Sequence, residues 1–212
     1  MKVPLVLVTA GPTREKIDPV RFISNYSTGT FGYAIAKEAR DRGCRVVLVT
    51  GPVSIEPPSG VKTIRIESAI DMLKAVSTWS KKADYIFMAA AVSDWRAANQ
   101  ANAKLKKCGR DFSLKLTENP DILKSIGKKR NYRLVGFALE TGSLARNAEK
   151  KLRSKNLDMV VANKLGKGDN LFGDNKIDVL IMDKYGKRYP YKAISKERLA
   201  KIILDKAFKF DI

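Results

Sequence analysis

The chain has 212 residues, of which 44% are hydrophobic, and it carries a formal net charge of +19 and no histidine. This length and apolar content suffice for a substantial buried core, and no apolar run approaches the roughly 20 residues of a membrane-spanning helix. The lack of histidine excludes Ser-His triads, histidine proton transfer and histidine metal ligands. Catalysis would then depend on lysine, arginine, asparagine, acidic side chains and backbone amides, which suits phosphoryl or nucleotidyl transfer.

The charge and the cysteines bear on partners and location. An excess of cations indicates an anionic partner. Because the aromatic residues are not interleaved with the basic ones, we favour a solvated lysine surface and a small anionic substrate, and we predict no nucleic-acid partner. Cys44 and Cys108 fall in unrelated contexts and are predicted to be reduced thiols. No targeting signal is visible at the start of the chain, so we expect a cytoplasmic protein with no membrane partner.

The first segments predict a strand, a turn and an ordered loop. Residues 5–9 are a continuous apolar run of the kind buried on both faces of a sheet, and residues 11–13 form a turn. Residues 14–24 are polar and too numerous for a simple turn, so we expect a long functional loop at the carboxyl end of the strand. A helix is expected over residues 31–42, with Gly43 just beyond its end.

The stretch 25–32, Asn-Tyr-Ser-Thr-Gly-Thr-Phe-Gly, is predicted to be the floor of an active site. It leads into a helix whose first-turn N–H groups are unpaired and carry partial positive charge. Gly29 and Gly32 would let the backbone approach a phosphate or carboxylate without interference from a Cβ. The side-chain amide of Asn25 can donate to an oxyanion and accept from an amine.

Beyond the first helix the chain alternates strands and helices. Further strands are expected at residues 46–50, 61–66, 84–88, 133–137 and 157–162. Helices are expected after the caps Ser68, Asn119 and Ser195, with Pro120 at the first position of the second of these, and over residues 141–155. The alternation predicts one α/β domain over residues 1–212, with a Rossmann-like, doubly wound and mostly parallel sheet.

Two stretches depart from this alternation. Residues from about 96 to 117 contain an alternating strand at 112–116 and are predicted to form a flap or hairpin insertion. Residues 163–176 form a glycine-rich loop. Residues 177–182 are expected to pair with residues 189–191 as an antiparallel hairpin at the edge of the sheet.

A nicotinamide-binding reductase is one alternative, because a strand followed by glycines and a helix also occurs in dinucleotide sites. The dinucleotide fingerprint needs closely spaced glycines, whereas Gly11 and Gly29 are far apart and no acid ends the second strand. Tyr33 and Lys37 match the Y-x-x-x-K spacing of short-chain dehydrogenases, but they lie in the first helix, where a reductase would not place them, so we interpret the match as chance. A basic nucleic-acid-binding module is the other alternative.

Several motifs together resemble those of phosphopantothenoylcysteine synthetase. They are TAGPTRE at 9–15, IDPVRFISN at 17–25, STG at 27–29, AAAVSDWR at 89–96, KLKK at 104–107, NPDI at 119–122 and GFALET at 136–141. They cover nearly the whole chain in the order that the family has. The KLKK flap resembles the bacterial, CTP-dependent branch of this phosphopantothenate–cysteine ligase.

The resemblance implies a reaction of coenzyme A biosynthesis. The enzyme would join 4′-phosphopantothenate and L-cysteine, with CTP activating the carboxylate as an acyl-cytidylate and yielding CMP and pyrophosphate. Mg²⁺ would arrive with the nucleotide, because the acids of this chain do not form a metal cage of their own. The family is a homodimer and is often fused to a flavin-dependent decarboxylase, so a second copy and a separate decarboxylase are the expected protein partners.

The resemblance also implies roles for particular residues. Asn25 would act in converting the acyl-cytidylate to product, and Lys104, the first lysine of the flap, would offset triphosphate charge. Arg21, Gly29 and Ala91 would contact the substrate or the intermediate. The expected nucleotide contacts are Met88, Ala89, Ala90, Asp94, Lys104, Pro120, Asp121, Ile122, Leu123, Phe137, Lys151 and Lys155.

The chain departs from the family pattern at its glycine-rich stretch. Thr30 and Phe31 stand where the family often has Lys-Met, and Tyr26 replaces a commonly basic residue. The missing lysine removes a positive charge close to the expected phosphate site.

Overall fold

The structure is a computed structural model that describes residues 2–107, 109, 111–128, 130–164 and 176–209. Its main sheet has eight strands in the order β12-β11-β10-β9-β6-β1-β4-β5. The strands that run parallel are β1 (Leu5–Ala10), β4 (Arg45–Thr50), β5 (Lys62–Arg65), β6 (Tyr85–Met88), β9 (Arg133–Glu140) and β10 (Met159–Lys164). β11 (Ile177–Asp183) and β12 (Arg188–Ile194) form an antiparallel hairpin at one edge. The predicted fold class, with its antiparallel edge hairpin, is confirmed.

β1 is the strand from which the sheet grows in both directions. The chain adds β4 and β5 on one side of it and then returns to add β6 and β9 on the other side. Every residue of Leu5–Ala10 is buried, because helices cover both faces of the sheet. In a doubly wound sheet, the carboxyl ends of the strands on either side of such a reversal leave a crevice between their loops. Here that crevice lies between the loops that follow β1 and β6.

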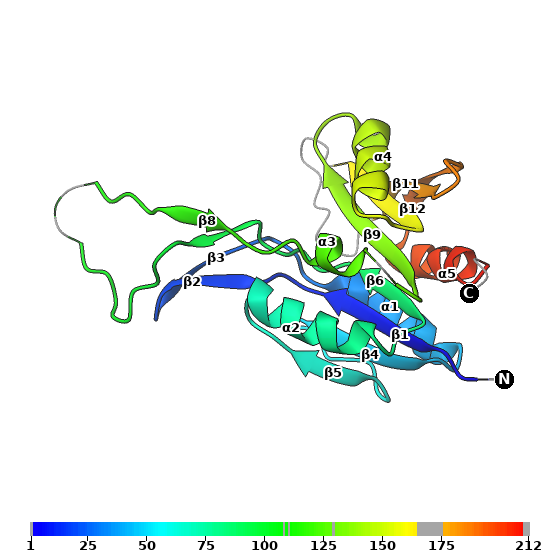
Figure 1. The fold of residues 1–212 in the computed structure, drawn as a ribbon, viewed down its shortest axis with the longest axis horizontal. Coiled ribbons are helices and arrows are strands. Elements are labelled where there is room, and N and C mark those ends of the chain that lie inside the picture. The colour runs from blue at the N-terminus through cyan, green and yellow to red at the C-terminus, as the bar shows by residue number, and fades with distance from the viewer. Residues whose placement is uncertain (1, 108, 110, 129, 165–175, 210–212) are drawn as a thin grey trace.

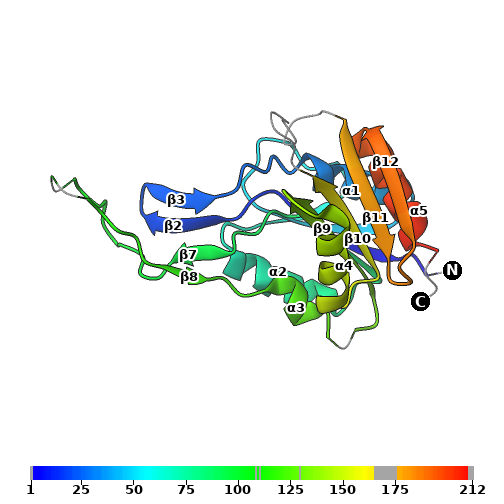
Figure 2. The ribbon, with the colours of Figure 1, turned by 90° about the horizontal axis from the view of Figure 1, so that it is seen from above.

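The helices form two layers, one on each face of the sheet (Figure 1, Figure 2). α1 (Thr30–Asp41) and α5 (Lys196–Ala207) pack together on one face, over a core that includes Val6 and Val8. α2 (Ala69–Ser80), α3 (Ile122–Ile126) and α4 (Leu144–Ser154) cover the other face, over a core that includes Leu5 and Leu7. Successive residues of β1 therefore serve opposite cores, as the period of a strand requires.

Two of the predicted caps are confirmed and two helix starts are wrong. Ser68 caps α2 in a reciprocal box with Asp71, and the Ser195 hydroxyl accepts from the backbone N–H of Arg198 in α5. α3 is capped by Asp121, whose carboxylate accepts from the N–H of Lys124 at 2.8 Å. Asn119 does not cap the helix, because its side chain donates instead to the backbone oxygen of Ser93.

α4 also begins later than predicted. Residue 141 does not open it, because β9 continues to Glu140, where it still pairs with Lys164 of β10. The chain then needs a turn before Leu144, the first helical residue.

Residues 14–24 are not the loop that their composition suggested. They form an antiparallel ribbon of β2 (Arg14–Asp18) and β3 (Arg21–Ser24). A second ribbon pairs β7 (Trp95–Ala97) with β8 (Leu116–Glu118), and β2 packs against β7. The predicted strand at 112–116 is thus shifted toward the C-terminus, because pairing with β7 decides the register. Both ribbons project from the carboxyl edge of the sheet as one arm, defined here as residues 14–24 and 95–118 (Figure 2).

Some predictions fall outside the described part of the chain. These are the thiol of Cys108 and most of the glycine-rich loop at 163–176, of which residues 163 and 164 belong to β10. Cys44 is described and is a free thiol. Within the described ranges, no helix combines the length and apolar character needed to cross a bilayer.

Candidate active site

The loops that follow β1 and β6 are bonded to one another at the crevice. The N–H of Ala91 donates to the oxygen of Gly11 at 2.9 Å, and the N–H of Thr13 donates to the oxygen of Ala91 at 3.2 Å. The buried hydroxyl of Thr13 accepts from the N–H of Ser93 at 2.9 Å. These hydrogen bonds therefore fix the position of the segment after β6 relative to the end of β1.

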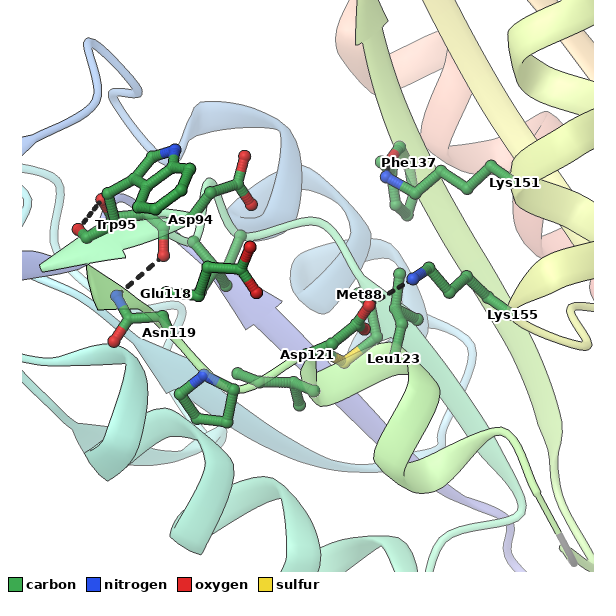
Figure 3. A pocket seen from close by; sticks show the side chains of 15 residues that line it. Met88, Asp94, Trp95, Glu118, Asn119, Asp121, Leu123, Phe137, Lys151 and Lys155 are labelled. Atoms are coloured by element: carbon green, nitrogen blue, oxygen red, sulfur yellow. Dashed lines mark hydrogen bonds and ion pairs between the residues drawn. The ribbon is translucent and has the colours of Figure 1, made fainter. Parts of the chain in front are cut away.

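A pocket of about 470 Å³ opens beside this segment (Figure 3). It is built from the end of β6, the following loop, the start of α3, β9 and one face of α4. Its lining residues are Met88, Ala90, Val92, Ser93, Asp94, Trp95, Glu118, Asn119, Pro120, Asp121, Ile122, Leu123, Phe137, Lys151 and Lys155. A cavity of this size, with apolar walls and a few charged groups, is typical of a small-molecule site.

Lys151 of α4 and Lys155, the C-cap residue of that helix, provide the positive charge of the pocket. Lys151 and Lys155 are four residues apart and share one helix face, which is turned toward the pocket in Figure 3. Lys151 Nζ donates to the backbone oxygen of Phe137 at 2.5 Å, and Lys155 pairs with the carboxylate of Asp121. Both cations thus contact acceptors of the protein.

The surroundings shift the pKa values of these groups. Burial is the largest influence on Lys151 and lowers its pKa, Glu140 opposes that shift and the charge of Lys155 adds to it. For Asp121, burial opposes ionisation, but the hydrogen bonds from Lys155 and from the N–H of Lys124 outweigh it and leave the pKa below its usual value. Lys151 is therefore a cation whose charge an anionic ligand would stabilise.

Two carboxylates lie on the opposite side of the pocket from the lysines. In Figure 3, Asp94 and Glu118 lie across the cavity from Lys151 and Lys155. Carboxylate oxygens suit a hard cation such as Mg²⁺, which usually keeps water and phosphate oxygens as its other ligands. Among the residues that the structure describes, no group of three or more acidic or cysteine side chains could hold a metal ion by itself.

A smaller hollow of about 90 Å³ lies at the start of α1. It is lined by residues 27–32 together with Ala89, Asn163, Ile177 and Lys196. Gly29 stands at the cap of α1 with a φ of 80°, and the first turn of the helix contains no acidic residue. This end of the helix has the polarity that favours an anion.

Packing against β1 requires a glycine at position 32. A Cβ at this position would lie 2.5 Å from the Cβ of Ala10 and 2.9 Å from the oxygen of Thr9. The absence of a side chain therefore lets α1 lie directly against β1. Gly32 also lines the hollow, so its approach to an anion stays a prediction to which packing adds a second reason for glycine. Gly29, with its positive φ, also needs to be a glycine.

The hollow and the larger pocket share a wall. Ala89 lines the hollow and Ala90, the next residue, lines the pocket. Phe31 of the hollow packs edge-on against Phe137 of the pocket, with ring centroids 5.2 Å apart. One ligand could therefore occupy the pocket while a second lies within reach of it.

Asn25 and Ala91 are brought together by a hydrogen bond. The Nδ2 atom of Asn25 donates to the oxygen of Ala91 at 2.9 Å, and the Asn25 residue is exposed. An amide nitrogen carries two hydrogens, so one donor remains after this bond. Both residues were predicted from the motifs to contact the reacting groups, and the structure makes them neighbours.

Arg21 and Lys104 lie elsewhere, in the arm. The guanidinium of Arg21 pairs with Asp18 and donates to the oxygen of Leu105 at 2.8 Å. Lys104 is exposed and does not line the pocket.

The predicted nucleotide contacts form one group in space. All of them except Ala89 and Lys104 line the larger pocket, although they come from four separate segments of the chain. Sequence reasoning missed Val92, Ser93, Trp95 and Glu118, and it assigned Asn119 to a helix cap. Val92, Ser93, Trp95 and Asn119 lie within the quoted motifs and Glu118 directly precedes one, which was the signal that could have found them.

The Y-x-x-x-K spacing of the first helix has a structural explanation. Tyr33 is buried against the sheet and its hydroxyl donates to Thr50 Oγ1 at 3.3 Å, whereas Lys37 is exposed. The tyrosine is a core residue and does not form a site with the lysine.

The fold and the crevice define an α/β domain with a ligand site at the point where its strand order reverses. Residues 1–210 match the family described as the DNA/pantothenate metabolism flavoprotein C-terminal domain, and the chain belongs to that family. The family resemblance inferred from the motifs is thereby confirmed.

Several relatives support this assignment. The chain is 43% identical over 193 residues to the coenzyme A biosynthesis bifunctional protein CoaBC of Bacillus subtilis, an alignment that covers 90% of this chain and 48% of that protein. Identity to the Escherichia coli K12 protein of the same name is 39% over 206 residues, which covers 94% of this chain and 50% of that protein. The chain thus spans about half the length of these relatives.

Solved structures agree with the fold. The crystal structure of the C-terminal domain of a coenzyme A biosynthesis bifunctional protein CoaBC superimposes with a TM-score of 0.83 at 39% identity, covering 97% of this chain and 94% of that one. A Cab2 variant in complex with phosphopantothenate-cysteine gives a TM-score of 0.79 at 19% identity, over 97% of this chain and 87% of that one. At that identity the Cab2 match supports the fold alone.

Proposed function

We propose that this domain is the CTP-dependent ligase that joins 4′-phosphopantothenate to L-cysteine in coenzyme A biosynthesis. In the first half-reaction a carboxylate oxygen of phosphopantothenate attacks the α-phosphorus of CTP, and pyrophosphate leaves. In the second, the cysteine amine attacks the acyl carbon of the acyl-cytidylate, CMP leaves with the bonding electron pair, and the amine loses a proton. The observation that carries the proposal is that the predicted nucleotide positions other than Ala89 and Lys104 converge on one pocket beside the anion-favouring start of α1.

The charges of the pocket support binding of a nucleoside triphosphate. Lys151 and Lys155 lie on one helix face, so little conformational entropy is lost when both contact phosphates. Asp94 and Glu118 across the cavity are suited to the Mg²⁺ that accompanies a triphosphate, and this ion would neutralise phosphate charge. The small side chain of Ala90 would leave room in the pocket for a base.

The smaller hollow suits the second substrate. The phosphate of phosphopantothenate would lie at the start of α1 near Gly29, with its carboxylate directed toward the pocket. Asn25 would then use its remaining amide hydrogen to stabilise the oxyanion that forms when the amine attacks. Ala91, whose oxygen orients that amide, would contact the same intermediate.

The arm carries Arg21 and Lys104, and we assign it the contact with a second copy of the chain. Lys104 would offset phosphate charge in the first half-reaction, and Arg21 would contact the intermediate. The arm exposes apolar side chains, including those of Val20, Phe22 and Trp95. Such a surface suits contact with a second copy of the chain, and we propose a homodimer. We also propose a cytoplasmic location and a separate flavin-dependent decarboxylase as the preceding enzyme.

Pyrophosphate release tests this function. With phosphopantothenate present and cysteine omitted, CTP should yield pyrophosphate much faster than ATP. No pyrophosphate from either nucleotide would contradict the proposal. Equal rates would contradict the choice of CTP.

Asn25→Ala tests the assigned mechanism. The variant should still release pyrophosphate and should accumulate the acyl-cytidylate, which mass spectrometry detects. Asn147→Ala is the control, because the side-chain amide of Asn147 donates to Glu140 at 2.7 Å and Asn147 itself, although part of α4, does not line the pocket. Normal product formation by Asn25→Ala would remove Asn25 from the second half-reaction.

A further inference from the structure

The turn between β2 and β3 holds a buried carboxylate with an unusual number of donors. The side chain of Asp18 is fully buried. Its Oδ1 accepts from the N–H groups of Val20 and Arg21, each at 2.9 Å, which closes the turn. Its Oδ2 accepts from the guanidinium of Arg21 and from the N–H of Leu105 at 3.1 Å. One carboxylate therefore bonds both its own turn and a residue of the flap far away in sequence.

The flap is held at Leu105 through both of its backbone groups. Asp18 accepts from its N–H, and the guanidinium of Arg21 donates to its oxygen at 2.8 Å. A second bond joins the same two segments, from the N–H of Ala101 to the oxygen of Ile17 at 2.9 Å. Figure 2 shows the two ribbons side by side along the arm. Leu105 is half-buried, whereas Lys104 and Lys106 on either side of it are exposed. The anchor, defined here as the bonds of Asp18 and Arg21 to the backbone of Leu105, therefore lies between two solvent-exposed lysine side chains.

The carboxylate of Asp18 keeps its negative charge in this environment. The hydrogen bond from Arg21 is the main reason that the pKa of Asp18 lies far below its usual value, and the backbone N–H donors add to it against the opposing effect of burial. The carboxylate therefore stays ionised throughout the neutral range.

We propose that Asp18 is a positioning residue that, with Arg21, fixes the backbone of the flap at Leu105 and thereby sets the place of Lys104. This rests on the proposed role of Lys104 in cytidylyl transfer. Asp18 touches no substrate in this scheme, because it does not line either cavity. Arg21 gains a second task, since the same guanidinium that is expected to contact the intermediate also holds the flap.

Amide exchange in the wild-type protein tests the anchor without any substitution. The Leu105 amide should exchange at least about tenfold more slowly than the amides of Lys106 and Lys107, measured residue by residue by NMR. Similar rates for the three amides would overturn the proposal.

Asp18→Asn tests the consequence. The asparagine keeps an oxygen for the turn, but its NH₂ group faces donors at Leu105 and Arg21, so the flap should be released. Exchange at Leu105 should rise to the level of its neighbours. Glu15→Gln is the matched control, because Glu15 is equally buried in the same ribbon and accepts from the N–H of Ala69 at 2.9 Å, away from the flap. Unchanged exchange at Leu105 in Asp18→Asn would overturn the proposal.

A double-mutant cycle separates positioning from general damage. Asp18→Asn should slow pyrophosphate release about tenfold with little change in CTP affinity, because a misplaced group costs rate. In a Lys104→Ala background the same substitution should have less than about a twofold effect. If the two substitutions slow pyrophosphate release additively, the positioning role of Asp18 is overturned while the role of Lys104 is unaffected. Unchanged pyrophosphate release in Lys104→Ala would instead overturn the role of Lys104 itself.

Discussion

The sheet and the arm are stabilised by different forces. Val6 and Phe87, in the central strands, are 0% exposed, whereas Phe22 in the arm is 47% exposed and Phe112 is 64% exposed. The sheet therefore depends on the removal of apolar surface from water. The arm depends on polar contacts to its base, such as the bond from the Ser24 hydroxyl to the oxygen of Thr13 at 2.8 Å. The comparison indicates that burial of apolar surface stabilises the sheet, whereas hydrogen bonds hold the arm in place.

Large-to-small substitutions in the two regions should give the largest contrast. Phe87→Ala should lower the free energy of unfolding by about 3–5 kcal/mol, because it leaves a cavity in a fully buried site. Phe22→Ala should cost less than about 1 kcal/mol, because its ring is half exposed. Urea unfolding monitored by circular dichroism measures both values. Equal losses would mean that the arm folds as part of the core.

Removal of charge from the pocket should weaken nucleotide binding and leave the fold intact. Lys151→Met keeps most of the apolar stem but removes a charged donor, so CTP affinity should fall by about 1.5–3 kcal/mol, as for a hydrogen bond to a charged group. Lys150→Met is the control, because Lys150 is exposed and does not line the pocket. Isothermal titration calorimetry measures the CTP affinity of both variants. A similar loss in the two would indicate long-range attraction by the net charge of the chain.

The cap of α3 connects the pocket to the stability of the domain. Asp121→Ala should cost about 0.5–2 kcal/mol of unfolding free energy, because the N–H of Lys124 loses its acceptor. The ion pair with Lys155 adds little to stability, since its carboxylate is 41% exposed. Asp121→Asn should keep the cap and recover most of the loss. A failure of asparagine to do so, in the same urea experiment, would point to the charge instead.

The smallest expected effect is a dependence of CTP affinity on pH. The pKa of Lys151 in the free protein is lowered by burial, and bound phosphates would raise it again. The complex then holds more protons than the free protein, so affinity should fall as pH rises through the lowered pKa toward the ordinary value of 10.5. The unfolding free energy has the opposite slope in that window, because the unfolded chain binds more protons than the folded one. Lys151→Met should flatten both profiles relative to wild type.

Local patterns of the sequence predicted most of the elements of the sheet. The apolar run that became β1, the cap at Ser68 and the hairpin of β11 and β12 are confirmed because periodicity and capping depend on neighbours in the chain. The motifs also indicated the family, which the match over residues 1–210 confirms. The roles of the site residues, the extent of the domain and the choice of nucleotide stay predictions.

Tertiary contacts decided what local patterns could not. Residues 14–24 lack the apolar alternation of a half-buried strand, yet they pair as a ribbon that packs on β7. Asn119 has the composition of a cap, but its amide bonds to Ser93, and Asp121 caps the helix instead. The residues around Asp18 in the sequence did not indicate its hydrogen bond with the N–H of Leu105, 87 residues away. Hydrogen-bond partners that are distant in sequence are determined by where the sheet places each loop. A side chain that bonds two such loops therefore cannot be predicted from the local spacing of residues.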